Sequence, residues 1–263
     1  MSSLFSHLGQ SLRRPDHWLY GSWLDTVVRY RKTRLGIAWL LIPTAVYIWG
    51  IGGFLASMQT GVDKARYFAH VGIGFAVFRF MATVMIDAST VFTGYQGYIL
   101  DGQLRLTDFV LRNLARSFHY LLISLPVVGA VVVASPDFAP AGLPLSLLGV
   151  AVLLVNMFNF SALLAIAGAK FPDLHEIMSS VMMAAFLVTP IVWYDGAVQR
   201  DSAQGMLIEI NPFHHLLHLI RAPILGDQVA ASTYAYLLAT TVLGAVAAAV
   251  IYRRAARHVP IWL

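Results

Sequence analysis

The sequence has no cysteine and little charge. Without a thiol, the chain has no disulfide framework, no thiolate nucleophile and no cysteine-ligated zinc or iron–sulfur site. Only 12% of its 263 residues are charged and 58% are hydrophobic, whereas soluble chains carry about 25% charged and about 45–50% apolar residues. A water-facing surface would lack hydratable side chains, so the composition predicts an integral membrane protein.

The chain also lacks the motifs of nucleotide hydrolysis and of catalysis within a membrane. None of its lysines, Lys32, Lys64 and Lys170, follows a glycine, so no glycine-rich loop ending in lysine is present to hold nucleotide phosphates. Asp87 is the only carboxylate in the expected membrane spans, which leaves a two-carboxylate mechanism without its second member. We therefore expect a transport subunit that is not an enzyme and has no cofactor of its own.

The sequence does contain six apolar runs long enough to cross about 30 Å of hydrocarbon. They cover residues 36–57, 67–92, 118–135, 143–169, 177–194 and 233–252. None shows the alternation of a barrel strand, and helices are the other structure that satisfies its own backbone in lipid. The expected fold is all-helical, with a cytoplasmic N-terminus and interfacial helix (1–35), a six-helix membrane domain (36–252) and a cytoplasmic tail (253–263) in one domain.

Lysine and arginine are unevenly distributed around these runs. An even number of crossings places both termini on one side, and most of the basic residues flank that side. Because cytoplasmic segments carry the excess of basic residues, both termini are expected in the cytoplasm. The net charge of +5 thus indicates membrane orientation, and we expect no nucleic-acid partner.

Residues 15–32 form a separate amphipathic element before the first span. Apolar side chains recur at helical spacing, at Tyr20, Trp23, Leu24, Val27 and Val28. The pattern predicts a helix lying along the cytoplasmic leaflet, and a helix packed on a partner protein is the alternative. The expected interfacial anchors are Trp18, Trp23, Arg29, Tyr30, Arg31, Lys32, Arg34, Gly36 and Trp39.

Two connecting segments are too long to be simple turns. Residues 93–116 mix apolar and charged side chains and are expected to form a cytoplasmic amphipathic stretch. Residues 195–232 contain Asn211 and Pro212, which suit a helix cap and first residue, followed by a short apolar run over 213–225. That run is too short to cross a bilayer, so it predicts a short re-entrant or interfacial helix before the last span.

Histidines and one arginine remain as candidate functional groups. His214, His215 and His218 have no acidic residue beside them, so we expect no metal site. Arg79 lies within the second span, where a charge costs at least ~2.5–3.5 kcal/mol. It either faces a hydrated pathway for an anionic or hydroxyl-rich substrate or pairs with a carboxylate or carbonyl of another helix.

Aromatic side chains crowd the first two spans and their continuation. Sugars stack on such rings, although membrane helices also carry aromatics as packing residues and interfacial belts. The substrate-channel candidates are Arg79, Tyr47, Trp49, Phe75, Phe78, Tyr95 and Tyr98.

Four motifs in order along the chain resemble one transporter family. Residues 28–39 read Val-Arg-Tyr-Arg-Lys-Thr-Arg-Leu-Gly-Ile-Ala-Trp, and later come Phe-Pro-Asp-Leu at 171–174, Thr-Pro-Ile at 189–191, and Asn211-Pro212 followed by Arg221. This pattern is similar to that of the ABC-2 type permeases that export O-antigen, capsular polysaccharide and teichoic acid. Many such permeases carry a lysine and a Phe-Pro pair after the second span, where this chain has Leu-Arg-Leu-Thr-Asp-Phe at 104–109.

The resemblance implies an assembly in the bacterial cytoplasmic (inner) membrane. It implies a homodimer with two copies of a cytoplasmic ATPase that binds ATP and Mg, and as substrate a lipid-linked polysaccharide, often on undecaprenyl diphosphate. Residues 196–226 would form an outer gate, with Pro190, Asn211, Pro212 and Arg221 as its candidates. The ATPase-coupling candidates would be Asp101, Gln103, Leu104, Arg105, Leu106, Thr107, Asp108 and Arg112.

Two other functions remain as alternatives. An ion-coupled secondary transporter would want titratable groups at mid-membrane and two related halves. A membrane-embedded glycosyltransferase or phosphotransferase would want paired acidic residues.

Overall fold

A computed structural model describes residues 3–58, 63–102, 104–199 and 201–263, which contain helices and no strand. The α-helices are α1 (Leu4–Leu12), α2 (Gly21–Tyr30), α3 (Leu41–Ala45), α4 (Gly53–Met58), α5 (Lys64–Ala88), α6 (Val91–Gly94), α7 (Gln96–Leu100), α8 (Leu106–Val133), α9 (Leu143–Lys170), α10 (Leu174–Val188), α11 (Ala203–Glu209), α12 (Pro212–Ile224), α13 (Ala231–Ala255) and α14 (Val259–Trp262). The expected all-helical class is thereby confirmed.

Five helical segments in the described residues are long and apolar enough to cross a membrane. They are Gly36–Met58, Lys64–Ala88, Leu106–Val133, Pro140–Lys170 and Ala231–Trp262. The sixth expected span, 177–194, instead contains α10, which has 15 residues and is about 22 Å long. The chain turns extended at Thr189, before Pro190, so α10 alone is shorter than a hydrocarbon core. Six spans are therefore not confirmed.

The third span also differs from its expected bounds. Helix α8 begins at Leu106, well before residue 118, and includes Asp108, Arg112 and Arg116. The carboxylate of Asp108 accepts a hydrogen bond from the backbone N–H of Arg105 at 2.9 Å, which caps the first turn. The charged residues that interrupt the hydropathy signal are thus part of one continuous helix.

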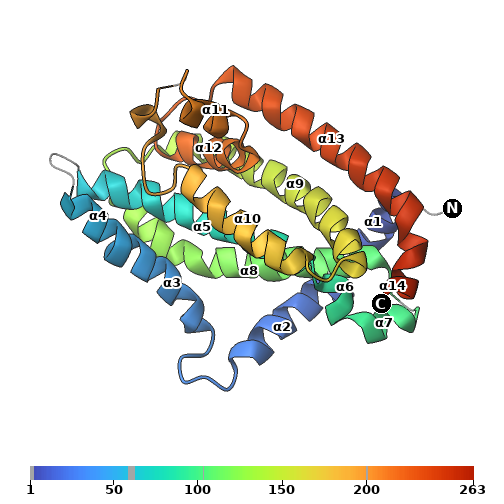
Figure 1. Ribbon diagram of the computed structural model, residues 1–263. Helices are drawn as coiled ribbons and strands as arrows, with labels where there is room; N and C mark the ends of the chain where they lie inside the picture. The colour runs from blue at the N-terminus through green and yellow to red at the C-terminus, as the bar shows by residue number, and fades with distance from the viewer. Residues whose placement is uncertain (1–2, 59–62, 103, 200) are drawn as a thin grey trace.

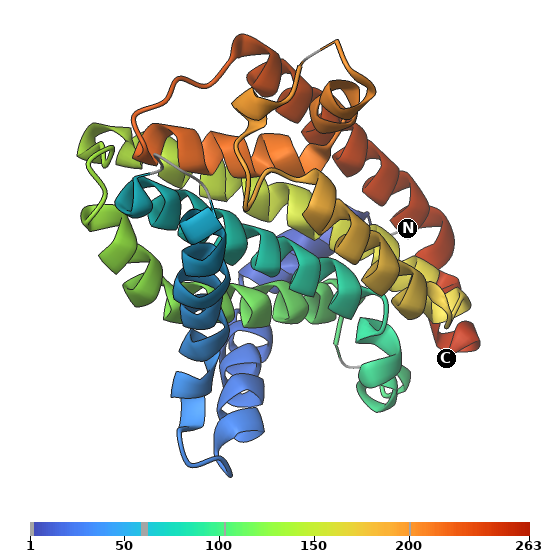
Figure 2. The same cartoon turned by 60° about the vertical axis from the view of Figure 1, so that its left-hand side comes forward.

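Helix α5 is the central element of the bundle (Figures 1 and 2). It packs against α8, α9, α10 and α12, and most of its side chains are buried. Glycines permit the closest contacts: a Cβ on Gly168 of α9 would lie 1.8 Å from the backbone oxygen of Ser89, just after α5. Small residues at such crossings let helix backbones approach, as is common in membrane proteins.

Both termini lie at the same end of the bundle, here called the terminal end (Figure 1). The ring Nδ1 of His7 in α1 hydrogen-bonds the Tyr252 hydroxyl near the end of α13, at 2.7 Å. The opposite end, here called the far end, contains residues 134–142 and the segment between α10 and α13.

Helices α2 and α3 project sideways from the bundle (Figure 2), and Gly36 between them has φ +55°, a conformation that favours glycine.

Candidate functional site

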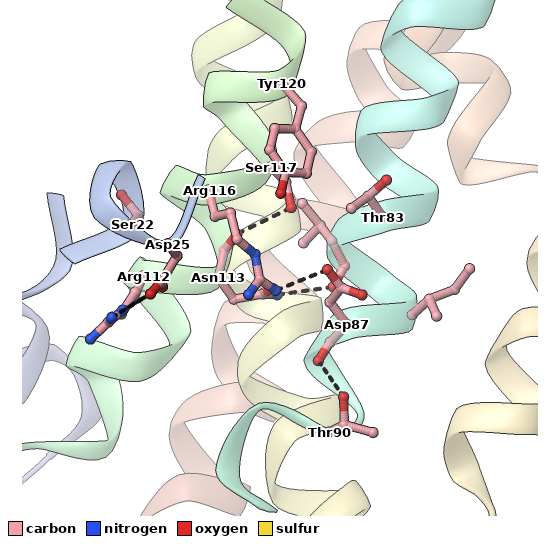
Figure 3. A network of polar contacts seen from close by, with 12 residues as sticks. Ser22, Asp25, Thr83, Asp87, Thr90, Arg112, Asn113, Arg116, Ser117 and Tyr120 are labelled. Carbon is pink, nitrogen blue, oxygen red and sulfur yellow. Dashed lines mark hydrogen bonds and ion pairs between the residues drawn. The ribbon is translucent and has the colours of Figure 1, made fainter. Parts of the chain in front are cut away.

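A polar network ties three elements together at the terminal end. Arg112 of α8 donates two hydrogen bonds to the Asp25 carboxylate of α2, from Nε at 2.8 Å and from Nη2 at 2.7 Å (Figure 3). The hydroxyl of Tyr95, between α6 and α7, donates to the same carboxylate at 2.8 Å. The guanidinium also lies 4.7 Å from the centre of the Tyr95 ring, so Arg112 contacts both groups.

The protonation states of this network follow from its hydrogen bonds. Burial raises the pKa of the Asp25 carboxyl, but the hydrogen bonds from Arg112 and Tyr95 outweigh burial and hold that pKa below its usual value. Burial, together with the hydrogen bond to Asp25, raises the pKa of Tyr95 to about 12. The site therefore contains a carboxylate, a guanidinium and a neutral phenol at neutral pH.

A second ion pair joins α8 to α5. Arg116 Nη2 donates to the Asp87 carboxylate at 2.9 Å and to the Asn113 side-chain oxygen at 3.1 Å (Figure 3). Asn113 in turn donates to the backbone oxygen of Val84 at 3.1 Å. Asp87, the one carboxylate expected within a span, is thus neutralised by a neighbouring helix.

An open cavity of about 590 Å³ lies between these two ion pairs. Its lining comes from α2, α5, α6 and α8 and consists of Leu24, Asp25, Val28, Arg29, Asp87, Thr90, Val91, Gly94, Tyr95 and Arg116. With both signs of charge in its wall, this groove suits a polar partner or ligand at the terminal end.

The ATPase-coupling candidates lie partly before α8 and partly within its first turns. Residues 106–112 belong to the first turns of α8, where Thr107 and Asp108 are buried and the Thr107 hydroxyl lies 2.7 Å from that of Ser11 in α1. Arg105 Nε donates to the Gln10 side chain at 2.8 Å, Leu104 and Leu106 are partly buried, and Asp101 is exposed. Gln103 lies outside the described residues.

Helices α6 and α7 project instead at the terminal end (Figure 2). Tyr98 is 61% exposed and Leu100 is 56% exposed on this projection. The sequence analysis included these residues in the cytoplasmic amphipathic stretch 93–116 but placed the coupling candidates after them, from Asp101 onward.

Arg79 lines a cavity between α3, α5 and α8. The cavity measures about 10 Å³, roughly the room for one water molecule. Residues with hydroxyl groups line the same cavity, namely Thr44, Thr83, Ser117, Tyr120 and Ser124. No carboxylate in the described residues lies within 4.0 Å of Arg79, and the cavity is too small for a sugar. In a single chain Arg79 is therefore partly buried, in a hydroxyl-lined pocket with room for about one water molecule.

The aromatic candidates divide between core and surface. Tyr47 stacks on Phe75 with ring centres 4.0 Å apart and meets Phe186 of α10 edge-on at 5.7 Å. Phe78 contacts Phe186 and Phe213 of α12, so these rings pack as a core ladder between helices. Trp49 is 49% exposed on the bundle surface, whereas Tyr95 and Tyr98 lie at the terminal end, so the candidates do not converge on one site.

The gate candidates do come together, near the far end. Asn211 caps α12 by accepting the Phe213 N–H at 2.9 Å, and its Nδ2 donates to the Thr189 hydroxyl at 2.9 Å. Pro212 is the first residue of α12. Arg221 Nη1 donates to the Pro190 backbone oxygen at 2.7 Å, which joins α12 to the end of α10.

His70 of α5 completes this joint, with its Nε2 3.2 Å from Arg221 Nη1. A single histidine in an apolar run gives no sequence signal for such a role. Among the described residues no group of three or more histidine, aspartate or glutamate side chains has the geometry to hold a metal ion. His215 bonds the Glu209 backbone oxygen at 2.8 Å instead.

Helix α2 packs its small polar face inward. Ser22 and Thr26 are buried and donate to the backbone oxygens of Leu19 and Ser22, whereas Tyr20, Leu24 and Val28 are exposed. The other anchor candidates are mostly at the surface: Trp23 and Trp39 are 40% and 45% exposed, Arg29, Arg31, Lys32 and Arg34 are exposed, and Trp18, Tyr30 and Gly36 are partly buried. Trp23 meets the His119 ring of α8 edge-on at 5.5 Å, whereas Tyr20, Leu24 and Val28 are exposed in the described part of the chain, which suits contact with lipid.

Comparison with known proteins agrees with these features. No family model matches the chain. The chain is similar to the O-antigen export system permease protein RfbA of Myxococcus xanthus, with 22% identity over 194 residues, which cover 72% of each chain. The resemblance to polysaccharide-export permeases is thereby confirmed, in a helical chain with several helices able to cross a membrane.

Proposed function

We propose that the chain is the transmembrane permease subunit of an ATP-binding-cassette exporter that moves a lipid-linked polysaccharide across the bacterial cytoplasmic membrane. The similarity to an O-antigen export permease over 72% of the chain carries this proposal. The sequence has no glycine-rich loop ending in lysine, so ATP and Mg would be bound by a separate ATPase subunit.

The proposed topology has both termini in the cytoplasm. Their common position at the terminal end and the excess of basic residues on that side support it. Helix α10, continued by residues 189–194, would be the sixth crossing, and α11 with α12 would enter the membrane from the outer side and return.

Two ATPase copies would dock on the α6–α7 projection of a permease homodimer. The exposed Tyr98 and Leu100 give this projection an apolar contact surface. Movement of the α6–α7 projection would then reach α2, α8 and α5 through the ion pairs Asp25–Arg112 and Asp87–Arg116, because each pair joins two helices.

The substrate passage would lie between the two permease copies. Large apolar side chains are exposed along α4 and α10, among them Phe54, Met183 and Leu187, and these surfaces suit a partner copy or lipid. The pocket at Arg79 would open to the substrate only when the helices around it move.

Deletion of the chromosomal gene tests this function directly. We expect surface polysaccharide to disappear and the lipid-linked glycan to accumulate in the cytoplasmic leaflet, with both effects reversed by the wild-type gene. Purified permease alone should not hydrolyse ATP, and it should co-purify with an ATPase encoded nearby. Glycan transport by the isolated chain under a proton gradient, or transfer of a sugar by it, would establish one of the two alternatives instead.

A further inference from the structure

One face of α12 remains unexplained by the proposed coupling. His214, His218 and Arg221 recur at helical spacing on this face, while the opposite face packs Leu216, Leu217 and Ile220 into the core. Two cavities of about 310 Å³ each lie over the polar face, and both are lined by Asp195 and His218. Together they form a polar trough near the far end.

Arg221 is the buried donor of this trough. It is only 4% exposed, and its bonds to Pro190 and His70 both use Nη1. Its Nε–H and Nη2–H₂ groups therefore have no acceptor among the described residues, although Arg221 lines the cavity. Because these donor groups face the cavity without a protein acceptor, they are available to a ligand that enters.

The remaining charges indicate what that ligand is. Arg66 is paired with Asp137 at 3.2 Å, whereas Asp195 and Asp227 line the same cavity as Arg221 and have no ion pair within 4.0 Å among the described residues. An anionic ligand would be repelled by the two carboxylates, and a cation by the guanidinium. A hydroxyl group both donates and accepts, so an uncharged polyhydroxylated ligand fits this mixed wall.

An aromatic ring in the same wall agrees with a sugar. Tyr194 lines the cavity, is 38% exposed, and has its ring centre 4.3 Å from that of His70. The ring offers the apolar face on which a pyranose stacks. A volume of about 310 Å³ is at the small end of the roughly 300–1,000 Å³ typical of ligand sites, so it suits a short glycan segment.

We infer that the trough formed by Arg221, Asp195, Asp227 and Tyr194 binds a neutral sugar unit of the glycan as it leaves the far end of the permease. This inference rests on the proposed export function and adds a contact site on the exit side. It differs from the gate prediction because it assigns a ligand to Arg221, which otherwise only joins α12 to the end of α10, and because it adds Asp195, Asp227 and Tyr194 to the site.

Saturation-transfer NMR on the purified permease tests this site. The protein is kept in a detergent without a sugar headgroup, and the probes are the neutral methyl glycosides of glucose, galactose, mannose and rhamnose. We expect at least one probe to bind wild type. The double variant Asp195→Asn, Asp227→Asn should bind that probe at least roughly tenfold more weakly, because neutral amides replace two charged acceptors whose hydrogen bonds are stronger. Arg221→Gln should act in the same direction if it folds.

Asp173→Asn is the matched control, because Asp173 is exposed beside the start of α10 and away from the trough. The inference is overturned if no probe binds, if the double variant binds as wild type does, or if Asp173→Asn weakens binding equally. Preferential binding of inorganic phosphate would also overturn it. The proposed export function is tested separately, by measuring polysaccharide export in wild-type cells and co-purification of the permease with the ATPase.

Discussion

The carboxylate of Asp25 accepts hydrogen bonds from two elements other than its own. Its side chain is 26% exposed and that of Arg112 is 20% exposed, so water screens the pair only in part. Because Arg112 would keep its charge without a partner, the pair costs more to break than a surface ion pair.

Asp25→Asn should therefore lower the free energy of unfolding by about 1–3 kcal/mol. Thermal unfolding in detergent measures the change, with Asp173→Asn as an exposed control. Equal stability of the two variants would show that the network contributes nothing.

The same carboxyl predicts a pH dependence. Its pKa is lower in the folded chain than in the unfolded one, so its stabilisation is complete above the usual value of about 4 and is lost as the pH falls through the folded pKa. Wild type should thus lose its stability advantage over Asp25→Asn on acidification below about pH 4. A constant difference between the two proteins from neutral to acidic pH would contradict this assignment.

Arg79 makes a different prediction, because its guanidinium has hydroxyl neighbours and no carboxylate among the described residues. Arg79→Ala should impair glycan export while leaving assembly with the ATPase intact, since Arg79 lies between α3, α5 and α8 and away from the α6–α7 projection. Export is measured as surface polysaccharide and assembly by co-purification. Unchanged export would make Arg79 a structural residue.

At the scale of elements, the contact between α9 and the end of α5 depends on the absence of a side chain. Gly168→Ala would place a Cβ against the Ser89 backbone oxygen, and the helices must separate. We expect a loss of about 1–3 kcal/mol in stability. Gly129→Ala on α8 is the control, because nothing lies within 4 Å of its Cβ, and it should be neutral or stabilising.

The α6–α7 projection is the other element with a direct test. Leu100→Asp should abolish co-purification with the ATPase, because a charge would replace an exposed apolar contact. Leu12→Asp, at an equally exposed position at the end of α1, should leave co-purification unchanged. If both variants still co-purify with the ATPase, α6–α7 is not the docking surface.

Hydropathy predicted the long helices well and their ends poorly, for physical reasons visible in α8 and α10. Arg112 and Arg116 interrupt the apolar signal, yet α8 continues through them because Asp25 and Asp87 neutralise them from other helices. In α10 the apolar run continues past Thr189, where the backbone turns extended. The motifs singled out Thr189, Pro190, Asn211 and Arg221 separately, but their contacts with one another are tertiary. His70, which joins them, has no local signal.

For the whole molecule, the lack of cysteine makes topology easy to measure. Single cysteines introduced at Ser6 and Arg257 near the termini, and at Asp227 at the far end, need no background substitutions. A membrane-impermeant maleimide should label Asp227→Cys on intact spheroplasts, and Ser6→Cys and Arg257→Cys only after lysis. Labelling of the two terminal positions from opposite sides would refute the topology and, with it, the export assembly.

The bond from Arg221 to the Pro190 oxygen has a consequence for reading sequence variation in related chains. Every residue type has a main-chain oxygen, so a substitution at position 190 leaves the hydrogen-bond acceptor in place. Such a substitution needs no compensating change at position 221. Covariation between these two positions would then be weak even though they touch. Alignments that infer proximity from correlated changes would overlook this attachment of α12 to α10, and only coordinates or crosslinking would reveal it.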